Sequence, residues 1–341
     1  MTETIPVQLQ ERCAGLVTRL GLASADAVRS VQPLTGGVAS DIAAVDVGGQ
    51  IICMKFALEK LRVAEDWHAP VERNAAEYAW LDFAGATVPG CAPRLFGRDT
   101  DHNGFAMEFL QGDDVYLWKT ALLDRQAVKG EAAKVGRALG RIHAASAAPG
   151  FDTACFQNQA DFYDLRLEPY LAFTGAEHPD LDPALQELID GLESNAVTLI
   201  HGDVSPKNIL FRGGEPVFLD AECATMGDPS FDVAFCLNHL VLKTIHMPDR
   251  AHELMAEFGS FWSGYAGHVS WEDVRQLESR VCALLPALML ARVDGKSPVE
   301  YLDDATRSRV RKFSVPLVLN PPATLGRFAE AVRALSGGAG S

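Results

Sequence analysis

The chain has 341 residues, a formal net charge of −15 and 48% apolar residues. Its length exceeds the usual limit for one hydrophobic core, so we expect two domains or lobes, and its composition is globular rather than disordered. The negative charge argues against nucleic-acid binding, which needs a basic surface over the phosphates. The seven cysteines lack metal-ligand spacing, which argues against a zinc site or a disulfide framework and is typical of a reducing cytosol.

The sequence predicts a soluble, cytoplasmic protein. Its first residues lack a basic start followed by an apolar run, so no signal peptide is expected. The longest apolar stretch, residues 281–293, is too short to span a bilayer and contains Pro286. We therefore expect no membrane partner, and the sequence leaves the choice between a monomer and a homodimer open.

The first third of the chain is rich in predicted strands. Apolar residues recur at helical spacing within residues 5–30, which predicts a leading helix. Two Gly-Gly pairs then divide residues 31–56 into three short strands. A helix is predicted over 71–85, ending at Gly85, and two more strands over 92–110.

After residue 111 the pattern changes to long amphipathic helices. Only one further β segment is expected, within residues 197–222. The fold class is therefore α+β and bilobal, with a small antiparallel-sheet N-terminal lobe over 1–110 and a larger, mainly helical C-terminal lobe over 111–336. Residues 337–341 are expected to be a disordered tail.

The stretch LIHGDVSPKNILFRGGEPVFLDAE, residues 199–222, places many polar groups between apolar strands. The Gly-Gly pair at 213–214 predicts a hairpin, which brings the two polar ends of the stretch together. One end holds Asp203 and Asn208, and the other holds Asp220 and Glu222.

These four side chains predict a cation site. Crowded carboxylates repel one another unless a cation neutralises them, and hard oxygen ligands suit Mg²⁺ better than zinc. A magnesium site with few protein ligands leaves room for substrate phosphates, and the remaining carboxylate, Asp203, is placed to accept a proton from a hydroxyl. This layout is typical of phosphoryl transfer. The alternative interpretation is a polar hairpin on the surface.

A lone cation, Lys55, occupies an inward-facing position in the apolar strand IICMKFA. A buried lysine needs a charged partner, so we expect a nearby carboxylate. The alternative is an edge-strand lysine that points to water.

The motif HGDVSPKN, followed by LDAECATMGDPSFDVA, resembles the aminoglycoside phosphotransferase and choline kinase superfamily, bilobal relatives of protein kinases. The resemblance covers roughly residues 30–310. Within the superfamily, the sequence is most similar to methylthioribose kinases. It implies a protein-kinase-like fold, ATP and Mg²⁺ as cofactors, and Asp203 as catalytic base. It also implies that Asn208 and Asp220 hold the metal, while Glu222 either assists as a ligand or contacts the substrate.

Several supporting roles follow from the same resemblance. His201 is expected to brace the catalytic loop, and Asp232 to hydrogen-bond its backbone, whereas Lys207 either meets a phosphate or faces solvent. Lys55 is expected to meet the α- and β-phosphates and to pair with an acidic residue on the following helix. Glu77 is favoured over Glu72 for that pairing.

The resemblance also locates the nucleotide contacts. The segment LTGGVASD takes the place of the loop over the phosphates, which suggests Gly36, Gly37 and Ser40 as cofactor-binding residues. Backbone groups of Glu108, Phe109 and Leu110 are expected to bind the adenine edge. Met107 is either a core residue or an adenine contact, and Trp67 either flanks the nucleotide or fills a surface groove.

The acceptor is expected against Asp203, with candidate segments at 161–170 and 290–302. Methylthioribose kinases grip their sugar with late arginines, which suggests Arg292, but surface salt bridges are the favoured interpretation of Arg292, Asp294 and Lys296. The sequence thus predicts a phosphotransferase acting on a small hydroxylated metabolite, a sugar or an amino-alcohol. The alternative is a catalytically silent nucleotide-binding scaffold.

Overall fold

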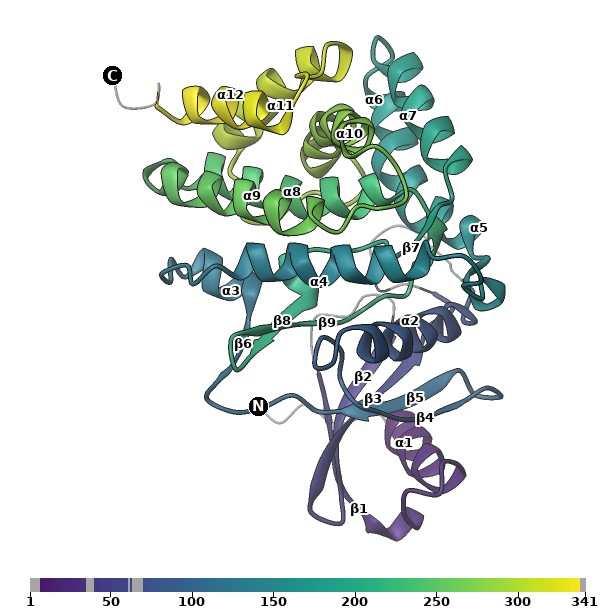
Figure 1. The fold of residues 1–341 in the computed structure, drawn as a ribbon. Helices are drawn as coiled ribbons and strands as arrows, with labels where there is room; N and C mark the ends of the chain where they lie inside the picture. Colours follow the sequence, from purple (N-terminus) through teal and green to yellow (C-terminus); the bar gives the residue numbers. More distant parts are fainter. Residues whose placement is uncertain (1–6, 35–39, 61, 63–69, 338–341) are drawn as a thin grey trace.

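The computed structural model describes residues 7–34, 40–60, 62 and 70–337. A twisted sheet with two helices forms the smaller end of the molecule, and a body of packed helices forms the larger end (Figure 1). The α+β, bilobal fold class predicted from the sequence is confirmed. The exact division at residues 110 and 111 stays a prediction.

The smaller end is built on a five-stranded antiparallel sheet with the strand order β1-β2-β3-β5-β4. Its strands are β1 (Val28–Pro33), β2 (Ser40–Val47), β3 (Gln50–Ala57), β4 (Leu95–Asp99) and β5 (Gly104–Glu108). Gly48 and Gly49 join β2 to β3 with φ angles of 64° and 100°, a backbone region that favours glycine. The second Gly-Gly pair therefore forms the predicted hairpin turn.

Strand alternation decides where Lys55 points. On β3, Met54 and Phe56 pack in one cluster with Leu16 of helix α1 (Val7–Arg19). The odd-numbered side chains, Cys53 and Lys55, therefore face the other side of the sheet. Helix α2 (Arg73–Thr87) covers that side, so β3 directs Lys55 toward α2.

Two predicted helix boundaries are wrong. The leading helix ends at Arg19, and β1 already begins at Val28, within the segment expected to be helical. Helix α2 continues two residues past Gly85 to Thr87. Gly85 does not adopt the left-handed backbone conformation that ends helices at glycine, and so the helix runs through it.

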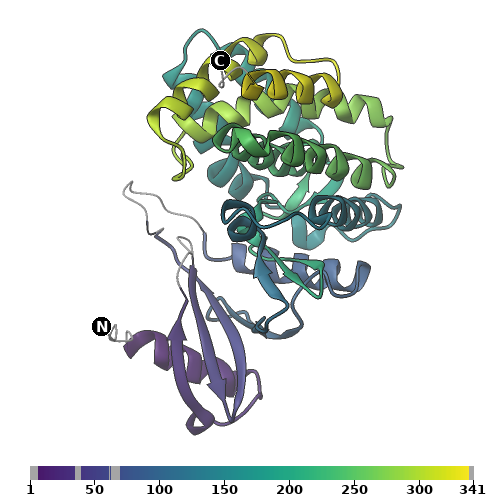
Figure 2. The ribbon, with the colours of Figure 1, turned by 90° about the vertical axis from the view of Figure 1, so that its left-hand side faces the viewer.

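The larger end of the molecule consists of packed helices (Figure 2). In helix α8 (Pro229–His246), every residue from Pro229 to Ile245 is buried. Asp228 caps this helix by accepting a hydrogen bond of 2.8 Å from the backbone N–H of Ser230. The other helical segments of this end are α3 (Trp118–Leu123), α4 (Glu131–Ser146), α5 (Gln159–Phe162), the π-helical segment η3 (Tyr163–Ala172), α6 (Phe173–Glu177), α7 (Asp182–Ser194), α9 (Ala251–Ala266), α10 (Val274–Asp294), α11 (Asp304–Leu319) and α12 (Leu325–Gly337).

Two small sheets lie between the helices and the larger sheet. One has the order β6-β8-β9, with β6 (Val115–Leu117), β8 (Ile209–Arg212) and β9 (Glu215–Phe218). The other pairs β7 (Thr198–Ile200) with β10 (Thr225–Gly227). The expectation of a single β segment in this half was too simple, because β6 and β10 have three residues each and form only through tertiary pairing.

The predicted hairpin in residues 199–222 is present. Strands β8 and β9 pair antiparallel, with Ile209 opposite Phe218, and Gly213 and Gly214 form the connection with φ angles of 58° and 77°. Two successive positive φ angles are the requirement of the tight turn that suits a right-twisted hairpin. Of the predicted tail, Gly337 belongs to α12 and the rest lies outside the described residues.

No helix in the described part of the chain combines the length and the apolar character that crossing a bilayer requires.

Candidate active site

A cavity of about 410 Å³ lies between the five-stranded sheet and the β8–β9 hairpin. Its size is within the usual range for small-molecule sites. The residues expected at the adenine edge, Glu108, Phe109 and Leu110, line it together with Met107. Its other polar lining residues are Lys55, Glu77, Lys119, Lys207, Asn208 and Asp220. The cavity therefore joins the predicted nucleotide contacts of the sheet to those of the hairpin.

Lys55 is held by two carboxylates. Its Nζ lies 2.8 Å from Oε1 and 2.7 Å from Oε2 of Glu77, and it also forms an ion pair with Asp220. Burial opposes the ammonium charge, but the carboxylates of Asp220 and Glu77 outweigh it and raise the pKa of Lys55. Of the two candidate partners, Glu77 on helix α2 makes the contact, whereas Glu72, directly before this helix, is exposed.

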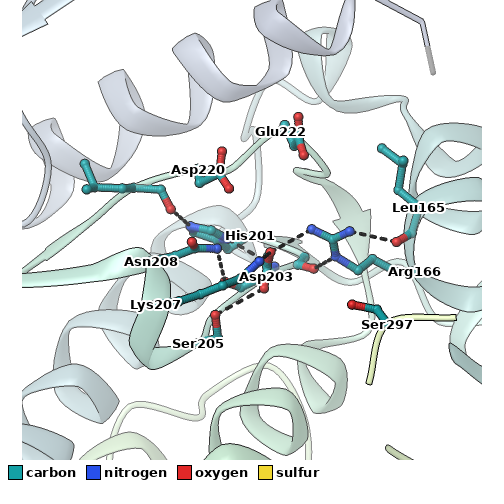
Figure 3. Close-up of polar contacts among 12 residues, drawn as sticks. Leu165, Arg166, His201, Asp203, Ser205, Lys207, Asn208, Asp220, Glu222 and Ser297 are labelled. Carbon is teal, nitrogen blue, oxygen red and sulfur yellow. Dashed lines mark hydrogen bonds and ion pairs between the residues drawn. The ribbon is translucent and has the colours of Figure 1, made fainter. Parts of the chain in front are cut away.

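Asp203 is buried among hydrogen-bond donors (Figure 3). Its Oδ2 lies 2.9 Å from Nη2 of Arg166 and 3.1 Å from Nζ of Lys207, and its Oδ1 accepts a hydrogen bond of 3.2 Å from the Ser205 hydroxyl. Burial alone would raise the pKa of this carboxyl, but Lys207 and Arg166 lower it. Asp203 is therefore ionised and held in one orientation.

His201 and Asp232 brace the loop that carries Asp203. The Asp232 carboxylate accepts hydrogen bonds from the backbone N–H groups of His201, at 2.6 Å, and Gly202, at 2.9 Å. Nδ1 of His201 accepts from the Asp203 N–H at 3.1 Å, so Nε2 carries the proton that is donated to the Leu219 carbonyl. Burial lowers the pKa of His201, which keeps the ring neutral and suits it to bracing.

Gly202 fixes the shape of this loop. Its φ is 77°, and a Cβ there would lie 2.8 Å from the Cβ of Cys223 and 2.9 Å from its carbonyl oxygen. Only glycine tolerates both the left-handed conformation and this close approach.

The hairpin brings Asn208 and Asp220 to the same end. The Leu219 N–H donates to the Asn208 carbonyl at 2.9 Å, directly before Asp220. Asp220 has a φ of 68°, an uncommon conformation for a non-glycine residue that is often found at functional sites. The Lys55 and Lys207 ammonium groups hold its pKa below the usual value although burial opposes ionisation.

This donor set fits Mg²⁺. The Asn208 amide N–H₂ donates to the Asp203 carbonyl at 3.2 Å, which leaves the amide oxygen as the group able to bind a cation. Carboxylate and amide oxygens are the ligands that Mg²⁺ prefers, and two of them leave positions for substrate oxygens. Among the described residues, no cluster of three or more His, Cys, Asp or Glu side chains has the arrangement of a metal site. The candidate Mg²⁺ ligands are therefore the Asp220 carboxylate and the Asn208 amide oxygen.

Glu222, the third predicted metal residue, has a protein partner. Its Oε2 accepts a hydrogen bond of 3.0 Å from Nε of Arg73, and both side chains are buried. This ion pair links the start of α2 to the segment after β9. Glu222 therefore also contributes to the contact between the two parts of the molecule.

The other predicted residues take different places. Ser40 is buried at the start of β2, opposite Ala57, whereas Gly36, Gly37 and Trp67 lie outside the described residues. Arg292 is buried and donates to the Tyr170 hydroxyl at 3.1 Å and to the Ser297 hydroxyl at 2.9 Å, so it is not a surface salt-bridge residue. Lys296 does pair with Glu168, and Asp294 pairs with Arg311.

Arg166 is the contact that the sequence interpretation missed. It lies in the candidate acceptor segment 161–170, between Leu165 and Leu167, and is held by η3. A charged residue in a run of leucines is disfavoured unless it is paired, and this was the signal available in the sequence. π-Helical turns are rare and frequently occur at functional sites.

The chain has relatives of known family. The model of the phosphotransferase enzyme family matches residues 30–268. Among solved structures, a choline/ethanolamine kinase family protein from Mesorhizobium loti aligns with a TM-score of 0.57 and 16% identity, over 96% of this chain and 99% of its own. The amicoumacin kinase hAmiN, solved with AMP-PNP, Ca²⁺ and Ami, aligns with a TM-score of 0.55 and 15% identity, over 92% and 97% of the two chains.

An aminoglycoside phosphotransferase from Alicyclobacillus acidocaldarius aligns with a TM-score of 0.53 and 14% identity, over 99% of this chain and 96% of its own. No curated protein matches the sequence. These structural alignments show a shared kinase-like fold, and the narrower likeness to methylthioribose kinases remains a prediction. Because the family model spans most of the chain, including both the Lys55 strand and the catalytic hairpin, this protein belongs to the phosphotransferase enzyme family.

Proposed function

We propose that the protein is an ATP- and Mg²⁺-dependent phosphotransferase that moves the γ-phosphate of the nucleotide onto a hydroxyl of a small molecule. The observation that carries the proposal is a single cavity lined by Lys55, Asn208 and Asp220, with the ionised Asp203 anchored on the same hairpin. The structure of the amicoumacin kinase hAmiN, which has this fold and was solved with AMP-PNP, Ca²⁺ and Ami, supports the proposal that this fold binds a nucleotide, a divalent cation and a small molecule together.

Each side chain has a role in this proposal. Asp203 orients the acceptor hydroxyl and takes its proton, and its low pKa is no obstacle, because a loose transition state places little demand on early proton removal. Arg166 and Lys207 keep the carboxylate in place. Lys55, positioned by Glu77, holds nucleotide phosphate oxygens.

The metal is assigned to Asn208 and Asp220, with Glu222 as a further candidate ligand. A bound Mg²⁺ would neutralise charge on the transferring phosphoryl group. In the protein alone, the Asp220 carboxylate is balanced by Lys55.

The second candidate is a nucleotide-binding scaffold without transfer activity. The presence of Lys55, Asp203, Asn208 and Asp220 in one arrangement argues against it, since binding alone does not require a buried carboxylate on the acceptor side.

The test is Mg²⁺-dependent ATP consumption measured over a panel of sugars, amino-alcohols and hydroxy acids. We expect turnover with at least one acceptor, and a loss of about a thousandfold or more in Asp203→Asn. The control is Asp180→Asn, an exposed carboxylate, which should match the wild type. Binding of Mg·ATP without turnover above the Asp203→Asn background for any acceptor would favour the scaffold.

A further inference from the structure

A group of basic side chains lies next to the catalytic carboxylate. Arg166 contacts Asp203, and one turn later on η3 the hydroxyl of Tyr170 accepts a hydrogen bond of 3.1 Å from Arg292. Arg292 also donates a hydrogen bond of 2.9 Å to the Ser297 hydroxyl. Arg166 and Tyr170, one turn apart on η3, thus contact Asp203 and Arg292 respectively, so η3 connects the region of Asp203 with the end of α10.

Helix α8 adds two more basic groups to this region. Phe235 packs against Tyr170, with ring centroids 5.5 Å apart, and against His239, at 5.4 Å. One turn after His239, the ammonium of Lys243 lies 4.9 Å from the centre of the Tyr301 ring. Lys119 of α3 lines the cavity and pairs with Glu300, next to Tyr301. We call Lys119, Lys207, His239, Lys243 and Arg292 the basic cluster.

The basic cluster carries more positive than negative charge. Lys207 is balanced by Asp203 and Lys119 by Glu300, whereas Arg292 contacts only neutral oxygens. Lys243 is 1% exposed, and within the described part of the chain its ammonium contacts the Tyr301 ring but has no ion pair or side-chain hydrogen bond. A buried, unpaired cation costs several kcal/mol, so it is not expected to persist for stability alone.

Polar atoms in the same region also lack partners. Within the described part of the chain, Nε2 of His239, Nε of Arg292 and the Tyr301 hydroxyl are buried without a hydrogen bond. Burial, together with the charges of Lys119 and Arg292, lowers the pKa of Lys243 to about 7. The chain as a whole carries a net charge of −15, which makes an unbalanced positive group beside the reacting carboxylate unusual for it. Unpaired donors and excess positive charge call for an anion.

We propose that the basic cluster binds an acidic group of the acceptor, so that the phosphorylated molecule is a hydroxylated carboxylate or phosphate rather than an amino-alcohol or a neutral sugar. This inference rests on the proposed phosphotransfer and specifies its substrate class. Arg292 and Lys243 hold the anion, and the acceptor hydroxyl reaches Asp203. Carboxylates and phosphates share the chemistry that recognises them, namely oxygen anions that accept several charge-assisted hydrogen bonds.

The first experiment compares matched acceptors. Glycerol, glycerate and glycerol 3-phosphate form one series, and glucose, gluconate, glucose 6-phosphate and glucosamine form another. For the series that is phosphorylated, we expect kcat/KM of the acidic member to exceed that of the neutral member by about tenfold or more, and the cationic member to be the poorest. The carboxylate and phosphate members distinguish the two sources of the anion. A neutral or cationic acceptor preferred over its acidic counterpart overturns the inference and leaves the phosphotransferase proposal intact.

The second experiment measures anion binding without turnover. Glycerate, gluconate and inorganic phosphate are titrated by calorimetry into the protein with ADP and Mg²⁺ present. We expect at least one anion to bind, and Lys243→Met to weaken that binding by about tenfold or more. Lys312→Met, which removes an exposed lysine on α11, should bind like the wild type. Tyr301→Phe keeps the ring and removes only the unpartnered hydroxyl, so it tests the same site if Lys243→Met fails to fold.

A binding role and a merely structural role for Lys243 predict different results. If Lys243 binds the anion, Lys243→Met should raise the melting temperature of the protein without added anion, because it removes an unpaired buried cation, while anion binding falls. Equal anion affinity in the wild type, Lys243→Met and Tyr301→Phe overturns the inference. Anion binding that depends on Lys243, in a protein that consumes no ATP with any acceptor, would sustain the anion site and defeat the phosphotransferase proposal instead.

Discussion

Arg166 and Asp203 form a buried ion pair that spans 37 positions in the sequence, with Nη2 of Arg166 2.9 Å from Oδ2 of Asp203. Nε of the same guanidinium donates to the Gly202 carbonyl at 2.7 Å. One side chain therefore fixes both the carboxylate and the backbone that carries it. A planar guanidinium suits this two-point contact better than an ammonium.

Replacing Arg166 should change the pH profile of turnover. Lys207 and Arg166 both lower the pKa of Asp203, so in Arg166→Gln the carboxyl becomes protonated at a higher pH. We expect the acidic limb of kcat to move upward in pH by roughly one unit and the plateau to fall by about tenfold. Arg166→Lys retains the charge and should keep the limb of the wild type at a reduced plateau. An acidic limb that does not differ between Arg166→Gln and Arg166→Lys would contradict the electrostatic role.

The Lys55 and Glu77 pair should show strong energetic coupling. Their side chains are 3% and 2% exposed, so loss of one partner leaves a buried charge, which typically costs about 3–5 kcal/mol. A double-mutant cycle with Lys55→Met and Glu77→Gln, followed by chemical denaturation, should give a coupling above about 2 kcal/mol.

The control for this cycle is the pair of Lys134 and Glu215, whose side chains are 27% and 67% exposed. Their coupling should stay below about 1 kcal/mol, because solvent screens exposed pairs. Equal couplings for the two pairs would mean that Glu77 does not hold Lys55.

Glu222 and Arg73 allow a test of the third metal ligand. If Glu222 binds the metal, Glu222→Gln should raise the Mg²⁺ concentration needed for half-maximal activity by about tenfold, which is the usual scale for the loss of a partner around a metal. Arg73→Lys keeps a cation beside Glu222 and should leave the Mg²⁺ requirement close to that of the wild type. If the two substitutions change the nucleotide KM alike and the Mg²⁺ requirement not at all, Glu222 acts by positioning α2.

Lys243 should make folding stability depend on pH. Burial, Lys119 and Arg292 lower its pKa from 10.5 to about 7 in the folded protein. Below pH 7 both the folded and the unfolded state hold the proton, and the folded state carries the full cost of the buried charge. Between about pH 7 and the ordinary lysine pKa, only the unfolded state holds the proton, so the contribution of this group to stability rises with pH.

The substitution Lys243→Met removes this titration. Its free energy of unfolding should exceed that of the wild type by up to a few kcal/mol near pH 6, and the difference should shrink toward pH 9. Chemical denaturation of both proteins across this range measures it. A difference that is constant with pH would mean that Lys243 is not a buried cation. The other groups around Lys243 are present in both the wild type and Lys243→Met, so the comparison isolates the titration of Lys243. These groups are Lys119, Cys236, His239, Arg292, Glu300 and Tyr301.

Local patterns in the sequence were sufficient to locate the catalytic hairpin and Lys55. The Gly213 and Gly214 turn fixes which strand ends meet, and strand alternation fixes the face on which Lys55 lies. The partners of Arg166 and Arg73 were not accessible in this way. Arg73 meets Glu222 across 149 positions, a pairing that no periodicity encodes.

The basic cluster shows the same limit more clearly. His239 and Lys243 lie in a helix whose apolar residues predict burial, but whether Lys243 finds an ion-pair partner depends on how α3, α8 and α10 pack together. The sequence pattern therefore predicts that Lys243 is buried, but it does not predict whether a carboxylate pairs with it.

Helix α2 serves two parts of the site at once. Glu77 on this helix holds Lys55, and Trp80, three residues on, packs edge-on against His201 with ring centroids 4.7 Å apart. His201 in turn receives the backbone N–H of Asp203. Under the proposed roles, a displacement of α2 that moves Lys55 would therefore also move the loop that carries Asp203. The proposal thus implies that nucleotide affinity and acceptor affinity are coupled through α2, and such coupling is necessarily reciprocal.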